Sequence, residues 1–168
     1  LIEPSTWSNV GNWFTDRSNL PHTASMNSTL TLPLVKRWQV QLGGPIIASA
    51  AGGHSDVYIG SGAEKLYALN PEDGSTVWAT ALGDKTSSAV TAIEEKDGSG
   101  AVFVTAEDGS LYSLNPYSGS QNWSRAGGIG SFISSTNYAT GRVYYVYMSS
   151  GVSSELCAVN AQNGQVIW

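Results

Sequence analysis

The stretch from residue 66 to residue 78, LYALNPEDGSTVW, occurs three times in the chain with small changes. Residues 111–123 read LYSLNPYSGSQNW and residues 156–168 read LCAVNAQNGQVIW, so each copy begins 45 residues after the one before. Leucine, asparagine, glycine and tryptophan recur at every fourth position of the phrase. A fixed period of this length indicates a stack of similar structural units.

The recurring polar and aromatic positions predict one local structure in each copy. The asparagine can accept a hydrogen bond from the backbone two residues on, and the glycine can adopt the left-handed conformation that turns the chain back. The tryptophan lies in the following strand, where a large flat ring can pack against the neighbouring unit. The motif residues are Asn70, Gly74 and Trp78; Asn115, Gly119 and Trp123; Asn160, Gly164 and Trp168; and Trp38, which precedes Trp78 by 40 residues.

Each repeat divides into four short strands separated by Gly, Asn, Asp and Ser turns, and no segment shows helical periodicity. The expected strands are residues 46–52, 56–61, 65–70 and 75–82 in the first repeat, 87–93, 101–107, 110–115 and 120–126 in the second, and 132–139, 142–148, 154–160 and 165–168 in the third. The pattern predicts an all-β protein with three antiparallel β-propeller blades at residues 46–82, 87–126 and 131–168. We expect an extra fourth strand at residues 34–42 and an irregular lead-in at residues 1–33.

Composition excludes some classes of function and favours one location. Charged residues make up 12% of the chain, against about 25% in typical domains, and the net charge of −5 provides no basic footprint for nucleic acid. The apolar run at residues 45–51 is too short to span a bilayer. Low charge, many small polar residues and two possible glycosylation sequons, at Asn27 and Asn122, favour a secreted, periplasmic or lumenal protein.

Residues 68–78 follow the pattern Ala-x-Asn-x-x-Asp-Gly-x-x-x-Trp, which closely resembles the tryptophan-docking motif of the pyrroloquinoline-quinone (PQQ) propeller repeat family. The second and third copies match it as well, and the resemblance covers about residues 34–168. Asparagine stands where the family usually has aspartate, and Asp73, Ser118 and Asn163 replace the family's threonine before glycine. Because the family's propellers have seven or eight blades, the resemblance implies that this chain is part of a larger propeller.

The resemblance leaves two functions open, because the repeat occurs in noncatalytic propellers and in quinoprotein dehydrogenases. A dehydrogenase of this family is expected to carry an acidic calcium site, a catalytic aspartate, an arginine near the quinone and often two adjacent cysteines. This chain has one cysteine and no such cluster. We therefore favour a noncatalytic scaffold that binds protein partners or the remaining blades. PQQ and calcium enter only under the alternative, the N-terminal portion of an alcohol or sugar dehydrogenase.

Other features of the sequence receive structural interpretations, and no catalytic or metal-binding residue is predicted. The lone Cys157 occupies the position of Tyr67 and Tyr112 in the sister repeats, which favours packing. The acidic stretches at residues 72–74, 94–98 and 107–109 are interpreted as solvated turns, and His22 and His54 as loop residues. Two further hypotheses concern surfaces: an insertion at residues 149–154 contributes to a partner or ligand surface, and open blade edges allow self-association.

Overall fold

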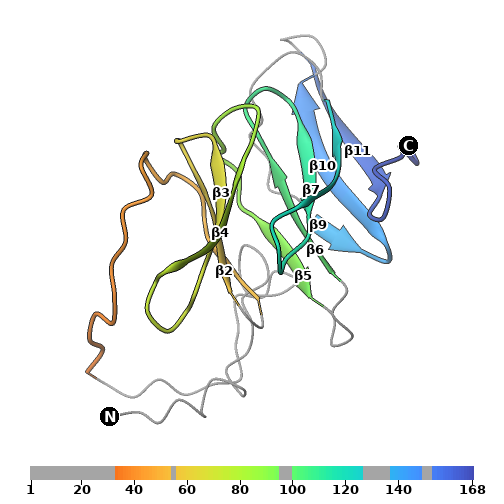
Figure 1. Ribbon diagram of the computed structural model, residues 1–168. Helices are drawn as coiled ribbons and strands as arrows, with labels where there is room; N and C mark the ends of the chain where they lie inside the picture. Colours follow the sequence, from red (N-terminus) through yellow and green to blue (C-terminus); the bar gives the residue numbers. More distant parts are fainter. Residues whose placement is uncertain (1–32, 54–55, 95–99, 127–136, 149–152) are drawn as a thin grey trace.

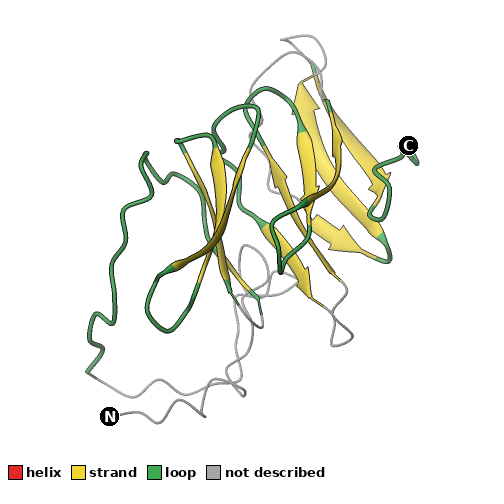
Figure 2. Cartoon of the chain, viewed as in Figure 1, coloured by secondary structure: helices red, strands yellow, loops and turns green. Residues whose placement is uncertain are grey.

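The structure, a computed structural model, describes residues 33–53, 56–94, 100–126, 137–148 and 153–168. Residues 1–32 of the predicted lead-in, which include Asn27 and His22, lie outside this part of the chain, as do His54 and residues 149–152 of the insertion. Within the described residues every element is a strand, and the strands form three separate sheets that stand side by side in sequence order (Figures 1 and 2). The prediction of an all-β protein built from antiparallel sheets is confirmed.

The first two sheets each contain four strands in sequence order, and the third contains three. Blade 1 comprises β1 (Ala51–Gly52), β2 (Val57–Ser61), β3 (Lys65–Leu69) and β4 (Thr76–Ala81). Blade 2 comprises β5 (Thr91–Glu94), β6 (Gly100–Thr105), β7 (Leu111–Leu114) and β8 (Gln121–Arg125). Blade 3 comprises β9 (Asn137–Ala139), β10 (Arg142–Met148) and β11 (Ser154–Asn160). All neighbouring strands are antiparallel.

Alternate residues of a strand point to opposite faces of its sheet, so each blade has two faces. The face of a blade that points toward the next blade in sequence is called the forward face, and the opposite face is called the rear face. In blade 1, Tyr58 pairs with Ala68 and Gly60 with Leu66 on the forward face, whereas Ile59 pairs with Tyr67 on the rear face. Both faces carry buried side chains, which requires that a layer of protein covers each of them.

Three apolar clusters fill the spaces between these layers. One joins the forward face of blade 1 to blade 2 and includes Tyr58, Leu66, Val90 and Val104. A second joins blade 2 to blade 3 through residues that include Phe103, Leu111, Val143, Tyr145 and Val159. The third covers the rear face of blade 1, where Leu42, Ile59 and Leu69 are buried with Trp38 and Val40 beside them. The hydrophobic core of the described residues therefore lies between neighbouring blades and between blade 1 and the segment at residues 38–42.

Several predicted strands differ from those observed, because a strand needs a partner as well as a suitable sequence. Residues 34–42 form no strand with any described residue and lie along blade 1 as an extended segment. Only two residues of the predicted strand 46–52 enter the ladder, and Ile46 and Ile47 are exposed. The predicted strand 165–168 is reduced to an isolated bridge between Val159 and Val166, extended by two backbone hydrogen bonds between Ala158 and the last two residues.

Candidate functional site

The three motif turns have nearly identical hydrogen bonds. In the first turn the N–H of Gly74 donates to the carbonyl of Asn70 (2.9 Å), and the N–H of Asn70 donates to the carbonyl of Ser75 (2.8 Å). The Asn70 side-chain oxygen accepts from the N–H of Glu72 at 2.8 Å. The turns at residues 115–120 and 160–165 repeat all three bonds within 0.1 Å, although Ala161 replaces the proline of the other two. Asparagine therefore closes each turn with both its backbone and its side chain.

Each of the first three motif tryptophans donates its indole N–H to the turn of the following blade. Trp38 Nε1 donates to the carbonyl of Pro71 at 2.9 Å, Trp78 Nε1 to the carbonyl of Pro116 at 2.8 Å, and Trp123 Nε1 to the carbonyl of Ala161 at 3.0 Å. These carbonyls all belong to the residue that follows the motif asparagine. One indole thus joins each pair of layers by a hydrogen bond as well as by its apolar area.

The motif glycines lie directly under these rings. Gly74, Gly119 and Gly164 have φ angles of 74°, 69° and 70°. A Cβ atom at these positions would lie 2.6 Å, 2.6 Å and 2.7 Å from the indole of Trp38, Trp78 and Trp123 respectively. Both the left-handed conformation and the contact with the ring require glycine. Glycine at this position is therefore required both by the turn and by the packing of the tryptophan ring between neighbouring layers.

Blade 1 adds a second hydrogen-bond donor that the motif does not contain. The Tyr58 hydroxyl donates to the same Pro116 carbonyl at 3.2 Å, and its ring lies 5.8 Å from that of Trp78. Phe103 holds the equivalent position in blade 2, 6.1 Å from Trp123, and Tyr144 holds it in blade 3, 6.1 Å from Trp168. Sequence reasoning missed this residue, and the aromatic at a fixed place in each second strand is the signal that could have identified it.

The acidic stretches do not converge in the described structure. Glu72 forms an ion pair with Arg37, and Glu107 forms one with Lys85 at 3.2 Å. Hydrogen bonds from the side chain and the backbone N–H of Ser75 hold the pKa of Asp73 below its ordinary value. Residues 95–98 lie outside the described residues. No group of three or more His, Cys, Asp or Glu residues that could hold a metal ion occurs in the described part of the chain.

The remaining sequence candidates have separate positions. Cys157 is buried in the cluster between blades 2 and 3, beside Tyr145. Asn122 is exposed on β8 and its amide donates to the Ser113 hydroxyl at 3.3 Å. Residues 149–152 of the insertion are not described. Within the described ranges, no helix has the length and hydrophobicity needed to cross a bilayer.

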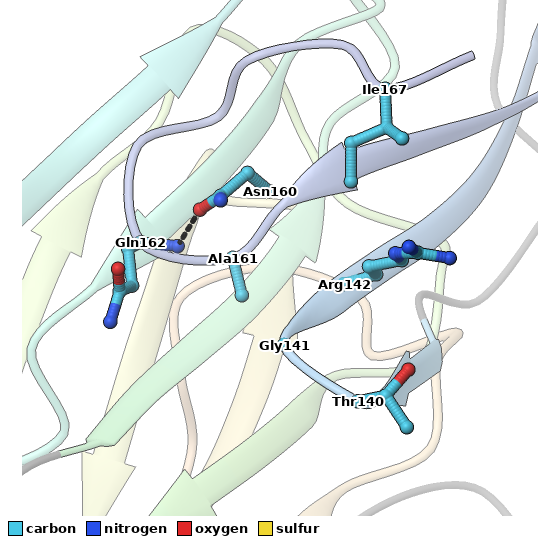
Figure 3. A pocket seen from close by; sticks show the side chains of 7 residues that line it. All are labelled: Thr140, Gly141, Arg142, Asn160, Ala161, Gln162 and Ile167. Atoms are coloured by element: carbon cyan, nitrogen blue, oxygen red, sulfur yellow. Dashed lines mark hydrogen bonds between the residues drawn. The ribbon is translucent and has the colours of Figure 1, made fainter.

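Two shallow hollows lie at the ends of the described structure. One, of about 400 Å³, is lined by the turn of blade 3 together with Arg142 and Ile167 (Figure 3). The other, of about 470 Å³, runs along residues 40–46. The first hollow is lined mainly by polar and small side chains. The second is lined by the apolar side chains of Val40, Leu42 and Ile46 together with Gln41 and two glycines.

Comparison with known proteins gives the following similarities. A family model described as outer membrane protein assembly factor BamB matches residues 35–168. BamB from Moraxella catarrhalis has a similar structure, with a TM-score of 0.60 and 20% identity over 79% of this chain and 38% of its own. Quinohemoprotein alcohol dehydrogenase ADHIIG from Pseudomonas putida HK5 has a TM-score of 0.73 and 17% identity over 94% of this chain and 26% of its own.

The computationally designed Ika4 protein has a TM-score of 0.60 and 17% identity over 81% of this chain and 79% of its own. No curated protein matches the chain by sequence. At these identities the structural similarities establish the fold alone, a β-propeller of the PQQ-repeat type. The chain spans 38% and 26% of the length of the two natural proteins that it resembles.

Proposed function

This chain belongs to the family described as outer membrane protein assembly factor BamB, and from that premise we propose that it is a noncatalytic propeller scaffold that binds protein partners. The observation that carries the proposal is that the recurring side chains of the described residues have structural contacts. The motif tryptophans, asparagines and glycines of the described joints hold turns and blades together. A scaffold of this kind presents its blade faces, edges and loops to other proteins.

We propose further that these three blades form part of a larger propeller, whose remaining blades are partners of this chain. The chain's 38% coverage of a natural propeller supports this proposal. We propose a secreted, periplasmic or lumenal location because the charge of the chain is low and because its family is described as an outer membrane protein assembly factor.

The alternative proposal, part of a quinoprotein alcohol or sugar dehydrogenase, is favoured by one observation. The similarity to the quinohemoprotein alcohol dehydrogenase extends over 94% of this chain. Within the described residues, however, Asp73 and Asp108 accept hydrogen bonds inside their own turns, and Glu72 and Glu107 lie in ion pairs on separate blades. These carboxylates do not fit a shared calcium site. Under the alternative, the quinone, calcium and catalytic residues belong to other blades.

The two proposals are tested with the complete product of the gene. Purified protein is examined for the absorbance of a bound quinone and for dye-linked oxidation of alcohols and sugars, before and after addition of PQQ and calcium. A scaffold shows neither signal, and it retains a protein partner in crosslinking from its native compartment. Quinone-dependent oxidation by the reconstituted protein would establish the dehydrogenase and contradict the scaffold.

A further inference from the structure

The rear face of each blade carries a cross-strand pair made of one tyrosine and one smaller side chain. In blades 1 and 2 the tyrosine lies on the third strand of the blade, whereas in blade 3 it lies on the second strand, β10. The tyrosine of blade 3 has therefore exchanged places with the smaller residue. The pairs are Ile59 with Tyr67 in blade 1, Val104 with Tyr112 in blade 2, and Tyr145 with Cys157 in blade 3.

The tyrosine hydroxyl of each pair forms a hydrogen bond with the layer that covers the rear face. In blade 1, Tyr67 donates to a backbone carbonyl of the preceding segment at 3.0 Å. In blade 2, the Tyr112 hydroxyl accepts from the backbone N–H of Gly83, which follows β4, at 2.8 Å. In blade 3, the Tyr145 hydroxyl accepts from the guanidinium of Arg125, the last residue of β8. The first two hydrogen bonds end on the backbone, and the third ends on a side chain.

Arg125 also departs from the repeat. It pairs with a leucine of β7 as Thr80 pairs with the equivalent leucine of β3, so Arg125 and Thr80 hold the same position on their fourth strands. The Thr80 hydroxyl donates to the carbonyl of Gly119, in the motif turn of blade 2, at 2.6 Å. In the next joint, the side chain at this position contacts the phenol of Tyr145. Three positions that differ from blades 1 and 2 therefore lie together in the joint between blades 2 and 3.

Size explains why Cys157 accompanies this change. Tyr145 and Cys157 are 2% and 8% exposed and belong to the apolar cluster between blades 2 and 3. Because protein interiors are close-packed, a second ring opposite Tyr145 would displace its neighbours. A small aliphatic residue opposite Cys157 would instead leave a cavity. The pair therefore fills the place that Val104 and Tyr112 fill in blade 2, with the ring on the other strand.

We propose that Arg125, Tyr145 and Cys157 form a matched set that specifies blade 3 as the neighbour of blade 2. A forward face with threonine in place of Arg125 would remove the donor to the buried Tyr145 hydroxyl. A rear face with tyrosine in place of Cys157 would have no room for the Tyr145 ring. Lost hydrogen bonds and steric clashes with the wrong partner are a common basis of specificity between similar surfaces.

The set makes the two joints between blades chemically different. Blades built from one repeat are exposed to incorrect pairing during folding, within a chain or between chains. A blade 3 with this rear face does not fit the forward face of blade 1, which carries Thr80. The inference goes beyond the proposed function, because it concerns how the blades recognise one another and holds whether or not the complete protein oxidises a substrate.

Urea unfolding of the 168-residue chain measures the contribution of each residue of the set. Tyr145→Phe should lower the folding equilibrium constant by about tenfold, because the lost hydrogen bond is made to a charged group. Cys157→Tyr should lower it by about tenfold or more through overpacking, and Tyr145→Val by about a hundredfold through the cavity that it leaves. Tyr117→Phe, at an exposed tyrosine on blade 2, is the matched control and should leave it unchanged. Circular dichroism checks that each variant is folded.

Exchange of the whole set tests whether its members are matched. The triple variant Arg125→Thr, Tyr145→Val and Cys157→Tyr copies the residues at these positions in the joint between blades 1 and 2. We expect its equilibrium constant to be at least tenfold higher than the three single losses together predict, because residues in contact are energetically coupled. A loss equal to the product of the three single losses would overturn the proposal. So would a Tyr145→Phe variant that is as stable as the unmodified chain.

Refolding separates specificity from packing alone. In the triple variant both joints carry the same set, so blade 3 of one chain fits the place of blade 2 in another. After dilution from urea, its yield of native protein should therefore fall with rising protein concentration more steeply than that of the unmodified chain. Tyr145→Phe keeps the ring on β10 and serves as a destabilised control that refolds like the unmodified chain. Equal yields of the triple variant and the unmodified chain at every concentration would contradict a role in specificity and overturn the proposal.

Discussion

Gly119 and Gly141 have similar backbone conformations but different surroundings. Their φ angles are 69° and 74°. A Cβ atom at Gly119 would lie 2.6 Å from the Trp78 ring, whereas one at Gly141 would meet nothing within 4 Å. We expect Gly141→Ala to lower the free energy of unfolding by about 1 kcal/mol, the cost of a positive φ. Gly119→Ala should lower it by about 3 kcal/mol, because the clash adds to that cost. Urea unfolding of both variants measures the difference, and equal losses would contradict the role of the indole contact.

Substitutions at the Pro116 carbonyl measure how much the second hydrogen-bond donor, the Tyr58 hydroxyl, contributes to stability. Tyr58→Phe removes one of its two hydrogen bonds and should cost about 1 kcal/mol in unfolding free energy, since Trp78 still satisfies the acceptor. The reciprocal change, Phe103→Tyr, places a hydroxyl at the equivalent position beside Trp123 and the Ala161 carbonyl. We expect it to stabilise the protein by a fraction of that amount in thermal unfolding. A loss of stability in Phe103→Tyr would mean that the two joints differ in geometry.

Sequence reasoning identified the recurring residues but not the atoms that they contact. The spacing of Asn115, Gly119 and Trp123 is visible because four residue types repeat together. The acceptor of each indole is a backbone carbonyl, 33 residues further along the chain for Trp38 and 38 residues further along for Trp78 and Trp123. The identity of a side chain gives no information about which backbone atom it contacts. The Tyr58 position was missed because its repeat includes Phe103, which has no hydroxyl.

At the scale of the strand, the joint between blades 2 and 3 contains a titratable group. Burial of β10 raises the pKa of Tyr145 above its ordinary value of 10.0, and a hydrogen bond with Arg125 partly opposes the shift. The folded state therefore favours the protonated phenol. The raised pKa of Tyr145 makes its full contribution to the free energy of unfolding below pH 10, where the phenol is protonated in both states. This contribution is lost as the pH rises from the pKa of Tyr145 in the unfolded chain through its higher pKa in the folded protein.

We therefore expect the free energy of unfolding to fall more steeply above pH 10 in the unmodified chain than in Tyr145→Phe. Urea unfolding at a series of alkaline pH values measures this slope, and ultraviolet absorbance of the phenolate follows the titration directly. Tyr117→Phe, at an exposed tyrosine, serves as the matched control and should keep the slope of the unmodified chain. Identical slopes in all three proteins would show that Tyr145 titrates normally.

The sequence predicts strands well where turn-forming residues next to the strand determine its ends. It predicts them less well where the strand forms only if another strand pairs with it. The third strands and the turns that follow them lie within the repeated phrase, and β3, β7 and β11 occur where expected. Residues 34–42 have the alternation of a strand but no neighbouring strand among the described residues. The run at residues 46–52 is apolar, yet only Ala51 and Gly52 face partners on β2. Periodicity indicates that a segment can be a strand, and the presence of a partner decides whether it becomes one.

At the scale of the whole molecule, each blade is stabilised by its own ladder and by the layers on its two faces. Blade 2 is covered by blade 1 on one side and blade 3 on the other. Blade 1 is covered by blade 2 on one face and on the other by residues 34–42, which pair with no described strand. Among the described residues, blade 3 is covered on its rear face by blade 2, and its forward face exposes Leu156 and Trp168. Stability should therefore be highest in the middle of the chain.

Hydrogen exchange of the native protein tests this order. Backbone amides of β7, whose residues are all buried, should exchange at least tenfold more slowly than those of β11, because opening blade 2 disrupts two joints and opening blade 3 disrupts one. Trp78→Ala, which removes the indole between blades 1 and 2, should bring β7 toward the rate of β11 while leaving β11 nearly unchanged. Equal exchange in β7 and β11 would instead indicate that the three blades open as one cooperative unit, so that stability does not depend on the number of covered faces.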